Sequence, residues 1–259
     1  MLIVISPAKT LDFESGPLTK KHTLPRLIDD SSVLIEELVQ RSPADIAGLM
    51  SLSPELAKLN VERYAEWDAE ARPGEARQAL LAFKGDVYIG MDIERFGERD
   101  YTEAQKSLRI LSGLYGVLRP LDLIYPYRLE MGTALRTDRG RNLYEFWGEK
   151  ITDRLRADLD ERPTRVLINL ASQEYFGAVQ PERLDARLIT PVFLDEKAGV
   201  PKVISFFAKK ARGAMAAWLI LNRVRSVKAL RDFDGLGYRF DPDRSTANVP
   251  TFIRPERAT

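Results

Sequence analysis

The chain contains no cysteine and only one histidine, His22. The missing cysteine excludes disulfides, iron–sulfur clusters, thiol catalysis and structural zinc. A Ser-His-Asp site would have to use His22, and no nucleophile motif accompanies that residue. Ferritin-type iron sites need Glu-x-x-His pairs on helices, and His22 belongs to none. We therefore predict no metal site, no cofactor and no assignable catalytic residue.

Long apolar runs are also missing. The N-terminal run over residues 1–5 is too short for a signal peptide or a membrane span, and Pro7 and Lys9 follow it closely. We therefore expect a cytoplasmic protein without a membrane partner, and we take a monomer as the working expectation. The 39 basic and 38 acidic residues give a net charge of +1. Any polyanion binding must then come from local clustering of charge.

Short apolar runs alternate with helical patterns along the 259 residues. The runs at 2–5 and 165–170 predict buried strands, and those at 188–194 and 200–207 predict two strands joined as a hairpin. Helical patterns are found at 27–40, 54–67, 75–83, 102–111, 143–159 and 208–222. The alternation predicts a single compact α/β domain over residues 1–259, with a mixed β-sheet wrapped by helices.

The stretch from 108 to 132 contains a possible phosphate-binding hairpin. A helical pattern runs into Gly113 and Gly116, and a second short element can begin at Val117. This outline is typical of a helix-hairpin-helix, which presents backbone N–H groups to phosphate. Two residues rather than one separate the glycines, so a helix that ends in a buried turn is the alternative. The cations assigned to DNA around this element are Lys106, Arg109, Arg119 and Arg128.

A strongly basic stretch lies between Lys197 and Arg231, with nine basic residues and no acidic one. Such clustering is the footprint of a polyanion partner, although a solvated cationic face is the alternative. Within the predicted helix 208–222, Lys209, Lys210 and Arg212 share one side. We predict that this side and the hairpin hold double-stranded DNA with little sequence specificity. Lys209, Lys210 and Arg212 should then face Arg109, Arg119 and Arg128 across one cleft.

A second group of polar residues follows two of the predicted strands. Lys9 and Thr10 come after the first strand, and Asn169, Ser172 and Glu174 lie at the end of the strand at 165–170. Open α/β sheets place ligands at such strand ends. If the strands are neighbours, one pocket results, in which Lys9 holds phosphate and Glu174 acts as acid or base. This predicts, as an alternative, an enzyme acting on a nucleotide or nucleobase; structural hydrogen bonding would explain the same residues without a pocket.

Several blocks of the sequence resemble the YaaA family of bacterial peroxide stress proteins. In order, the blocks are residues 6–12, 83–88, 111–122, 126–132, 169–172, 191–197, 204–206 and 208–213. The resemblance implies a cytoplasmic protein that helps cells survive hydrogen peroxide, binds DNA and is associated with less unincorporated iron. It also implies a compact α/β form, the cantaloupe fold, with a helix-hairpin-helix and a basic cleft. It brings no established catalytic residue and no established metal ligand.

Overall fold

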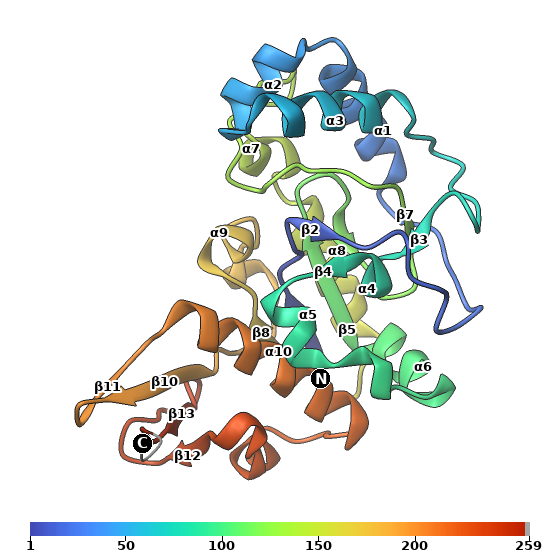
Figure 1. Ribbon diagram of the computed structural model, residues 1–259. Helices are drawn as coiled ribbons and strands as arrows, with labels where there is room; N and C mark the ends of the chain where they lie inside the picture. Colours follow the sequence, from blue (N-terminus) through green and yellow to red (C-terminus); the bar gives the residue numbers. More distant parts are fainter. Residues whose placement is uncertain (257–259) are drawn as a thin grey trace.

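The computed structural model describes residues 1–256 and is built around a five-stranded mixed sheet (Figure 1). Its strands are β1 (Leu2–Ile5), β5 (Leu108–Ser112), β6 (Gly116–Leu118), β8 (Val166–Leu170) and β9 (Arg187–Ile189), in the order β6-β5-β1-β8-β9. The central strand β1 is buried along its whole length, as its uninterrupted apolar run predicts. It runs parallel to both neighbours, β5 and β8, while β6 is antiparallel to β5. The predicted mixed α/β architecture is therefore confirmed.

A second mixed sheet has the order β11-β10-β13-β12. Its strands are β10 (Val192–Lys197), β11 (Val200–Lys202), β12 (Arg239–Asp241) and β13 (Thr251–Arg254). Ala198 and Gly199 both have positive φ values, which suits a two-residue turn, and β10 and β11 form a hairpin as predicted. The predicted bounds of 188–194 and 200–207 are wrong, because residues 188 and 189 belong to β9 and residues 205–207 begin a helix. Phe193, Phe233 and Phe252 pack together on this sheet. Two short pairs complete the strands: β2 (Thr10–Leu11) with β4 (Phe83–Lys84), and β3 (Arg77–Gln78) with β7 (Leu123–Ile124).

Helices surround these sheets, and Figure 1 shows α1, α2 and α3 gathered at one end of the molecule. The α-helices are α1 (Ile28–Val39), α2 (Pro43–Met50), α3 (Pro54–Ala65), α4 (Ala79–Ala82), α5 (Asp86–Met91), α6 (Glu98–Ser107), α7 (Leu143–Trp147), α8 (Lys150–Asp160), α9 (Gln173–Phe176) and α10 (Ser205–Leu221). The 3-10 helices are η1 (Ile93–Arg95), η2 (Pro181–Arg183), η3 (Lys228–Asp232) and η4 (Gly235–Gly237). Within residues 1–256, no helix combines the length and apolar character needed to cross a membrane.

The predicted helix-hairpin-helix is wrong, because the chain forms a β-hairpin there. The helix α6 ends at Ser107, and the next five residues form the buried strand β5. Gly113 is buried in the turn that follows β5, and Gly116 is buried as the first residue of β6. A Cβ at Gly113 would overlap the backbone carbonyl of Leu129, so this glycine is needed for close packing and not for a left-handed helix end. The apolar residues directly before Gly113 belong to the buried strand β5. A short apolar run fits both the helical and the strand periodicity, so its pattern could not distinguish the two.

The helices α5 and α10 cross with their backbones in contact. A Cβ at Gly213 would overlap the carbonyl of Val87, and a Cβ at Gly90 would overlap the carbonyl of Lys210. Only glycine at both positions permits this approach. The buried face of α5 packs on α10. The crossing fixes the first turns of α10 beside the start of α5.

Candidate functional site: a mixed-charge pocket at the strand ends

The carboxyl ends of β1 and β8 open into one pocket of about 350 Å³. These strands are direct neighbours, with Ile5 paired to Leu170, so the segments that follow them leave the sheet side by side. Four of the five residues predicted for a strand-end pocket line it together, namely Lys9, Thr10, Ser172 and Glu174. Opposite them, α10 contributes Lys209 and Arg212. The structure therefore brings these four residues to one pocket, and two of the predicted DNA-binding cations lie in the same place. The roles assigned to them stay predictions.

Three hydrogen bonds join the segments that form the floor of the pocket. The Ser6 hydroxyl lies 3.3 Å from the Ser172 hydroxyl and accepts a bond of 2.9 Å from the Ser172 backbone N–H. The Tyr88 hydroxyl, from α5, donates to the Ser6 carbonyl at 3.2 Å. Ser172 also caps α9 by accepting from the Tyr175 N–H. Three distant parts of the sequence are thus held in register before any ligand arrives.

One wall of the pocket carries a chain of ion pairs. Lys9 contacts Glu130 at 2.7 Å, and the other oxygen of Glu130 accepts from Arg128 at 2.9 Å. Burial alone would raise the pKa of Glu130, but hydrogen bonds from Lys9 and Arg128 outweigh this effect and lower the pKa. Glu130 is therefore ionised at neutral pH and shared by two cations. The three groups together leave one positive charge beside the pocket.

The opposite wall carries charges with no ionic partner among residues 1–256. Lys209 is exposed and Arg212 is half-buried, and neither contacts a carboxylate. Burial lowers the pKa of the Arg212 guanidinium. Asp86 begins α5 and has no cationic partner among residues 1–256, and Glu174 accepts a 3.1 Å hydrogen bond from the Gly132 backbone N–H. Two cations and two carboxylates are therefore available to a ligand within one small space.

The fifth predicted pocket residue, Asn169, lies on the far side of Ser172. It is buried in β8, and its side-chain oxygen accepts from the Ala171 N–H at 3.0 Å. It lines an adjoining hollow of about 890 Å³ that shares Ser172, Glu174, Lys209 and Arg212 with the strand-end pocket. Asn169 thus shapes the loop after β8 and stays outside the strand-end pocket itself.

Three of the four cations predicted near the hairpin form ion pairs with carboxylates of the protein. Arg109 is 4% exposed, and its Nε contacts Asp158 at 2.6 Å. Arg119 contacts the fully buried Asp122 at 2.9 Å. Arg128 reaches the pocket only through Glu130, and Lys106 is exposed on α6. The expected facing of Arg109, Arg119 and Arg128 toward α10 across a duplex-wide cleft is therefore wrong for Arg109, which a buried carboxylate holds in the interior.

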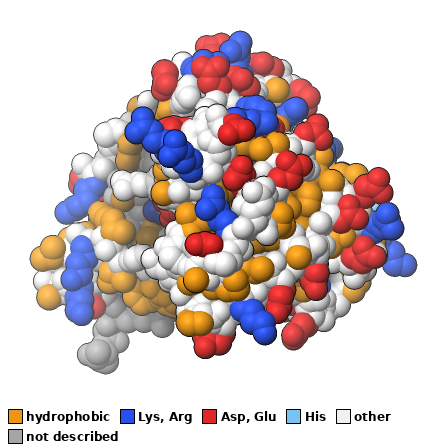
Figure 2. Space-filling model, turned by 90° about the horizontal axis from the view of Figure 1, so that it is seen from above, with side chains coloured by type: hydrophobic (Ala, Val, Ile, Leu, Met, Phe, Trp, Pro, Cys, Tyr) orange, Lys and Arg blue, Asp and Glu red, His pale blue; other side chains and the backbone are white. Residues whose placement is uncertain are grey.

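The basic stretch 197–231 keeps most of its charge free. Only Arg223 and Arg225 of its nine basic residues form ion pairs within residues 1–256, with Asp100 and Glu103 respectively. Seven therefore remain without a carboxylate partner in this part of the chain: Lys197, Lys202, Lys209, Lys210, Arg212, Lys228 and Arg231. By contrast, Figure 2 shows basic and acidic side chains interspersed on the face seen from above. The imbalance of charge is thus local to the C-terminal part.

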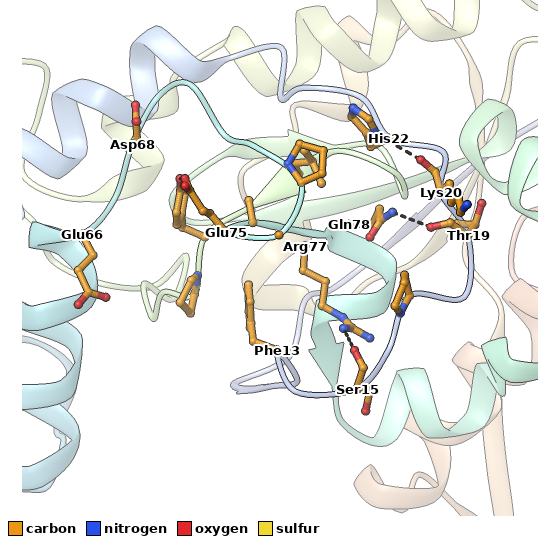
Figure 3. Close-up of a pocket in the computed structure, with 17 residues that line it drawn as sticks. Phe13, Ser15, Thr19, Lys20, His22, Glu66, Asp68, Glu75, Arg77 and Gln78 are labelled. Carbon is orange, nitrogen blue, oxygen red and sulfur yellow. Dashed lines mark hydrogen bonds between the residues drawn. The ribbon is translucent and has the colours of Figure 1, made fainter.

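A larger hollow of about 840 Å³ lies elsewhere, between the loop 13–22 and the segment 66–78 (Figure 3). Its edges are tied by the Gln78 amide, which donates to the Thr19 carbonyl at 3.1 Å, and by His22, whose Nδ1 lies 3.2 Å from the Lys20 carbonyl. None of the predicted site residues lines it. Within residues 1–256, no three His, Asp or Glu side chains are grouped so that they could hold a metal ion.

Sequence reasoning missed several polar side chains of the strand-end pocket, among them Lys84, Asp86, Tyr88 and Glu130. The signal was present, because residues 83–88 and 126–132 are two of the blocks that carry the family resemblance. Lys84 contacts Asp12 at 3.6 Å, which places residues 6–12, a third block, beside it. Five of the eight blocks, 6–12, 83–88, 126–132, 169–172 and 208–213, therefore contribute residues to one pocket although they are scattered along the sequence.

Comparison with known proteins shows which family the chain is similar to. The family model described as "Peroxide stress protein YaaA" matches residues 1–244. A UPF0246 protein of Marinomonas sp. (strain MWYL1) is 55% identical over 258 residues, which cover 100% of this chain and 98% of that protein. A UPF0246 protein of Cellvibrio japonicus (strain Ueda107) is 52% identical over 256 residues, covering 99% of both chains. The matched residues thus span almost the whole chain, and the pocket lies within them.

Proposed function

The chain belongs to the YaaA family of peroxide stress proteins, and from that membership we propose that it acts in peroxide stress by binding DNA largely without sequence specificity. The observation that carries the proposal is the set of seven cations in the segment 197–231 that have no carboxylate partner within residues 1–256. Unneutralised lysine and arginine are what phosphate backbones attract, and releasing counterions from DNA supplies the binding free energy.

The contact surface proposed here is α10 together with the β10–β11 hairpin. Lys202 is exposed on β11, and Lys209 is exposed near the start of α10. The ammonium of Lys210 lies over the ring of Phe206 at 4.2 Å, so its position is constrained as well. Arg109 has no part in this surface. Contacts of this kind position a protein on DNA without distinguishing bases, which supports low sequence specificity.

The first test is a titration of labelled duplexes of unrelated sequence at several salt concentrations. With about six phosphate contacts, the plot of log affinity against log salt should have a slope near −5. The affinities of the unrelated duplexes should agree closely at each salt concentration. Absent or salt-insensitive binding would refute the proposal.

The second test removes two adjacent cations of α10. The double change Lys209→Ala and Lys210→Ala should weaken DNA binding severalfold and leave the melting temperature unchanged or slightly raised, because neither ammonium has an ionic partner to lose. A matched control removes the same charge at the exposed Lys20 and Lys58, far from α10 in the sequence, and should leave DNA affinity unchanged. Lower stability with unchanged DNA affinity in the α10 variant would assign those lysines a structural role.

The link to unincorporated iron belongs to the same proposal and is indirect. His22, the single histidine, is not part of a Glu-x-x-His pair, so the sequence supplies no ferritin-type ligands. Cells lacking the protein should show more chelatable iron under peroxide, measured by electron paramagnetic resonance. Complementation with the Lys209→Ala and Lys210→Ala variant should fail to restore the lower level if DNA binding is the cause.

A further inference from the structure

We propose that the strand-end pocket binds a phosphorylated small molecule of nucleotide size, with Lys209 and Arg212 on its phosphate and Glu174 and Asp86 on its hydrogen-bond donors. This site shares Lys209 with the proposed DNA surface, but it differs in the ligand that it binds. A pocket of about 350 Å³ falls in the range of small-molecule sites and admits one nucleotide but no duplex.

The phosphate half of the proposal rests on Arg212. Its side chain is half-buried in the pocket and has no carboxylate partner among residues 1–256, which is a costly state for a cation. Burial lowers the pKa of this guanidinium, and a bound anion would reverse that effect. Lys209 lies one turn earlier on the same helix, so both cations approach one point. A guanidinium also matches the oxygens of a phosphate group in a two-point hydrogen bond.

The donor half of the proposal rests on two carboxylates that also lack cationic partners. Glu174 is oriented by the Gly132 N–H, which donates to one of its oxygens at 3.1 Å and leaves the other free. Asp86 stands in the first turn of α5, which the contact with α10 holds in place. A plain inorganic anion would satisfy the cations and meet repulsion from these acids. A ligand carrying both phosphate and hydroxyl or amino groups satisfies both halves, and a nucleoside monophosphate is such a ligand.

The pocket is also built before it is filled. Ser6, Ser172 and Tyr88 are hydrogen-bonded to one another across three segments, and Lys9 is held by Glu130. A preformed site binds with little loss of side-chain freedom. The α5–α10 crossing fixes the helix that carries Lys209 and Arg212, because glycines at 90 and 213 bring the backbones into contact.

Isothermal titration calorimetry of the full chain with AMP, GMP, CMP and UMP tests the proposal. At least one monophosphate should bind, and the corresponding nucleoside and inorganic phosphate should each bind at least about tenfold more weakly, because each satisfies only half of the site. Failure of all four monophosphates to bind would overturn the proposal. Equal binding of inorganic phosphate would also overturn it, since the carboxylates would then contribute nothing.

Two variants locate the site and separate it from the DNA surface. Arg212→Gln should weaken binding of the monophosphate at least about tenfold, whereas the matched change Arg99→Gln on α6 should have no effect. Glu174→Gln should weaken the monophosphate severalfold but leave DNA affinity equal or higher, because it removes a negative charge. Melting temperatures check that both variants are folded. Monophosphate binding that survives Arg212→Gln in a folded protein would contradict the proposal whatever the outcome with DNA.

Discussion

Two groups of cations that look alike in the sequence have opposite surroundings in the structure. Arg109 and Arg119 each contact a buried aspartate, Asp158 at 2.6 Å and Asp122 at 2.9 Å. Lys209 and Arg212 face a pocket without any such partner in residues 1–256. The difference shows that the fold, through the carboxylates it brings close, decides whether a cation is available to a ligand. A charge pattern alone records where cations are, and not whether they are already neutralised.

The largest expected effect comes from breaking the buried pair of the first group. Asp158 accepts from Arg26 at 2.7 Å and from Arg109 at 2.6 Å. Replacing Asp158→Ala leaves two arginines without their partner, and Arg109 cannot reach water. We expect a loss of about 3–5 kcal/mol in the free energy of unfolding, measured by urea denaturation.

A control on the same helix sharpens this prediction. Asp153 lies on α8 with a half-exposed side chain and contacts Arg183 at 3.4 Å. Asp153→Ala should cost less than about 1 kcal/mol, since exposed pairs contribute little. If Asp158→Ala and Asp153→Ala lowered the free energy of unfolding equally, burial of the ion pair would not explain the behaviour of Arg109.

The second group should instead depend on the backbone that holds it. In Gly213→Ala the new methyl group would overlap the Val87 carbonyl, so α10 must move away from α5. We expect a loss of about 1–3 kcal/mol in the free energy of unfolding and weaker binding of monophosphate, because Lys209 and Arg212 move with the helix. Calorimetry on the folded variant measures the second effect.

Gly48→Ala is the matched control for that substitution. Gly48 lies within α2, and a Cβ there would meet nothing within 4 Å. The free energy of unfolding should rise by up to about 1 kcal/mol, because alanine is the better helix former. Ligand binding should not change. If alanine lowered stability at both glycines, the loss at Gly213 could not be assigned to steric overlap with α5.

The smallest expected effect is a dependence of stability on acid. Burial alone would raise the pKa of Asp158, but hydrogen bonds from Arg26 and Arg109 and their charges hold it well below its ordinary value of 3.8. Because folding lowers this pKa, the stabilisation is complete above pH 3.8 and is lost as the pH falls toward the folded value. Urea denaturation at pH 5 and pH 3 should show a decrease of about 1 kcal/mol from this group. In Asp158→Ala this part of the decrease should vanish.

The sequence predicted the parts of the fold in which one signal dominates. Residues 2–5 are continuously apolar, and they form the central buried strand. Ser42 and Ser53, each followed by proline, cap α2 and α3 because local hydrogen bonds decide a helix start. The sequence did not predict that β1 and β8 are neighbours in the sheet, because no local signal sets the order of strands. The predicted pocket was therefore stated to depend on it.

The failures occurred where distant partners decide the outcome. Residues 108–111 match a helical rhythm over too few residues, and pairing with β1 makes them a strand. Arg109 has its neutralising carboxylate 49 residues away, which no window around it could reveal. Glu130 and Asp86 were missed for the same reason, because their importance comes from Lys9 and α10 and not from their own neighbours.

The strand-end pocket draws its walls from the beginning, middle and end of the polypeptide, and this has a consequence for its biogenesis. During synthesis, the loop after β1 and the start of α5 emerge first, and Arg212 leaves the ribosome more than a hundred residues after Asp86. Domains fold as units once enough chain has been synthesised, and contacts between distant residues form late. A nascent chain that ends before α10 therefore lacks one wall of the pocket. Occupancy of the pocket would therefore report that synthesis has passed α10 and that this helix has packed against α5.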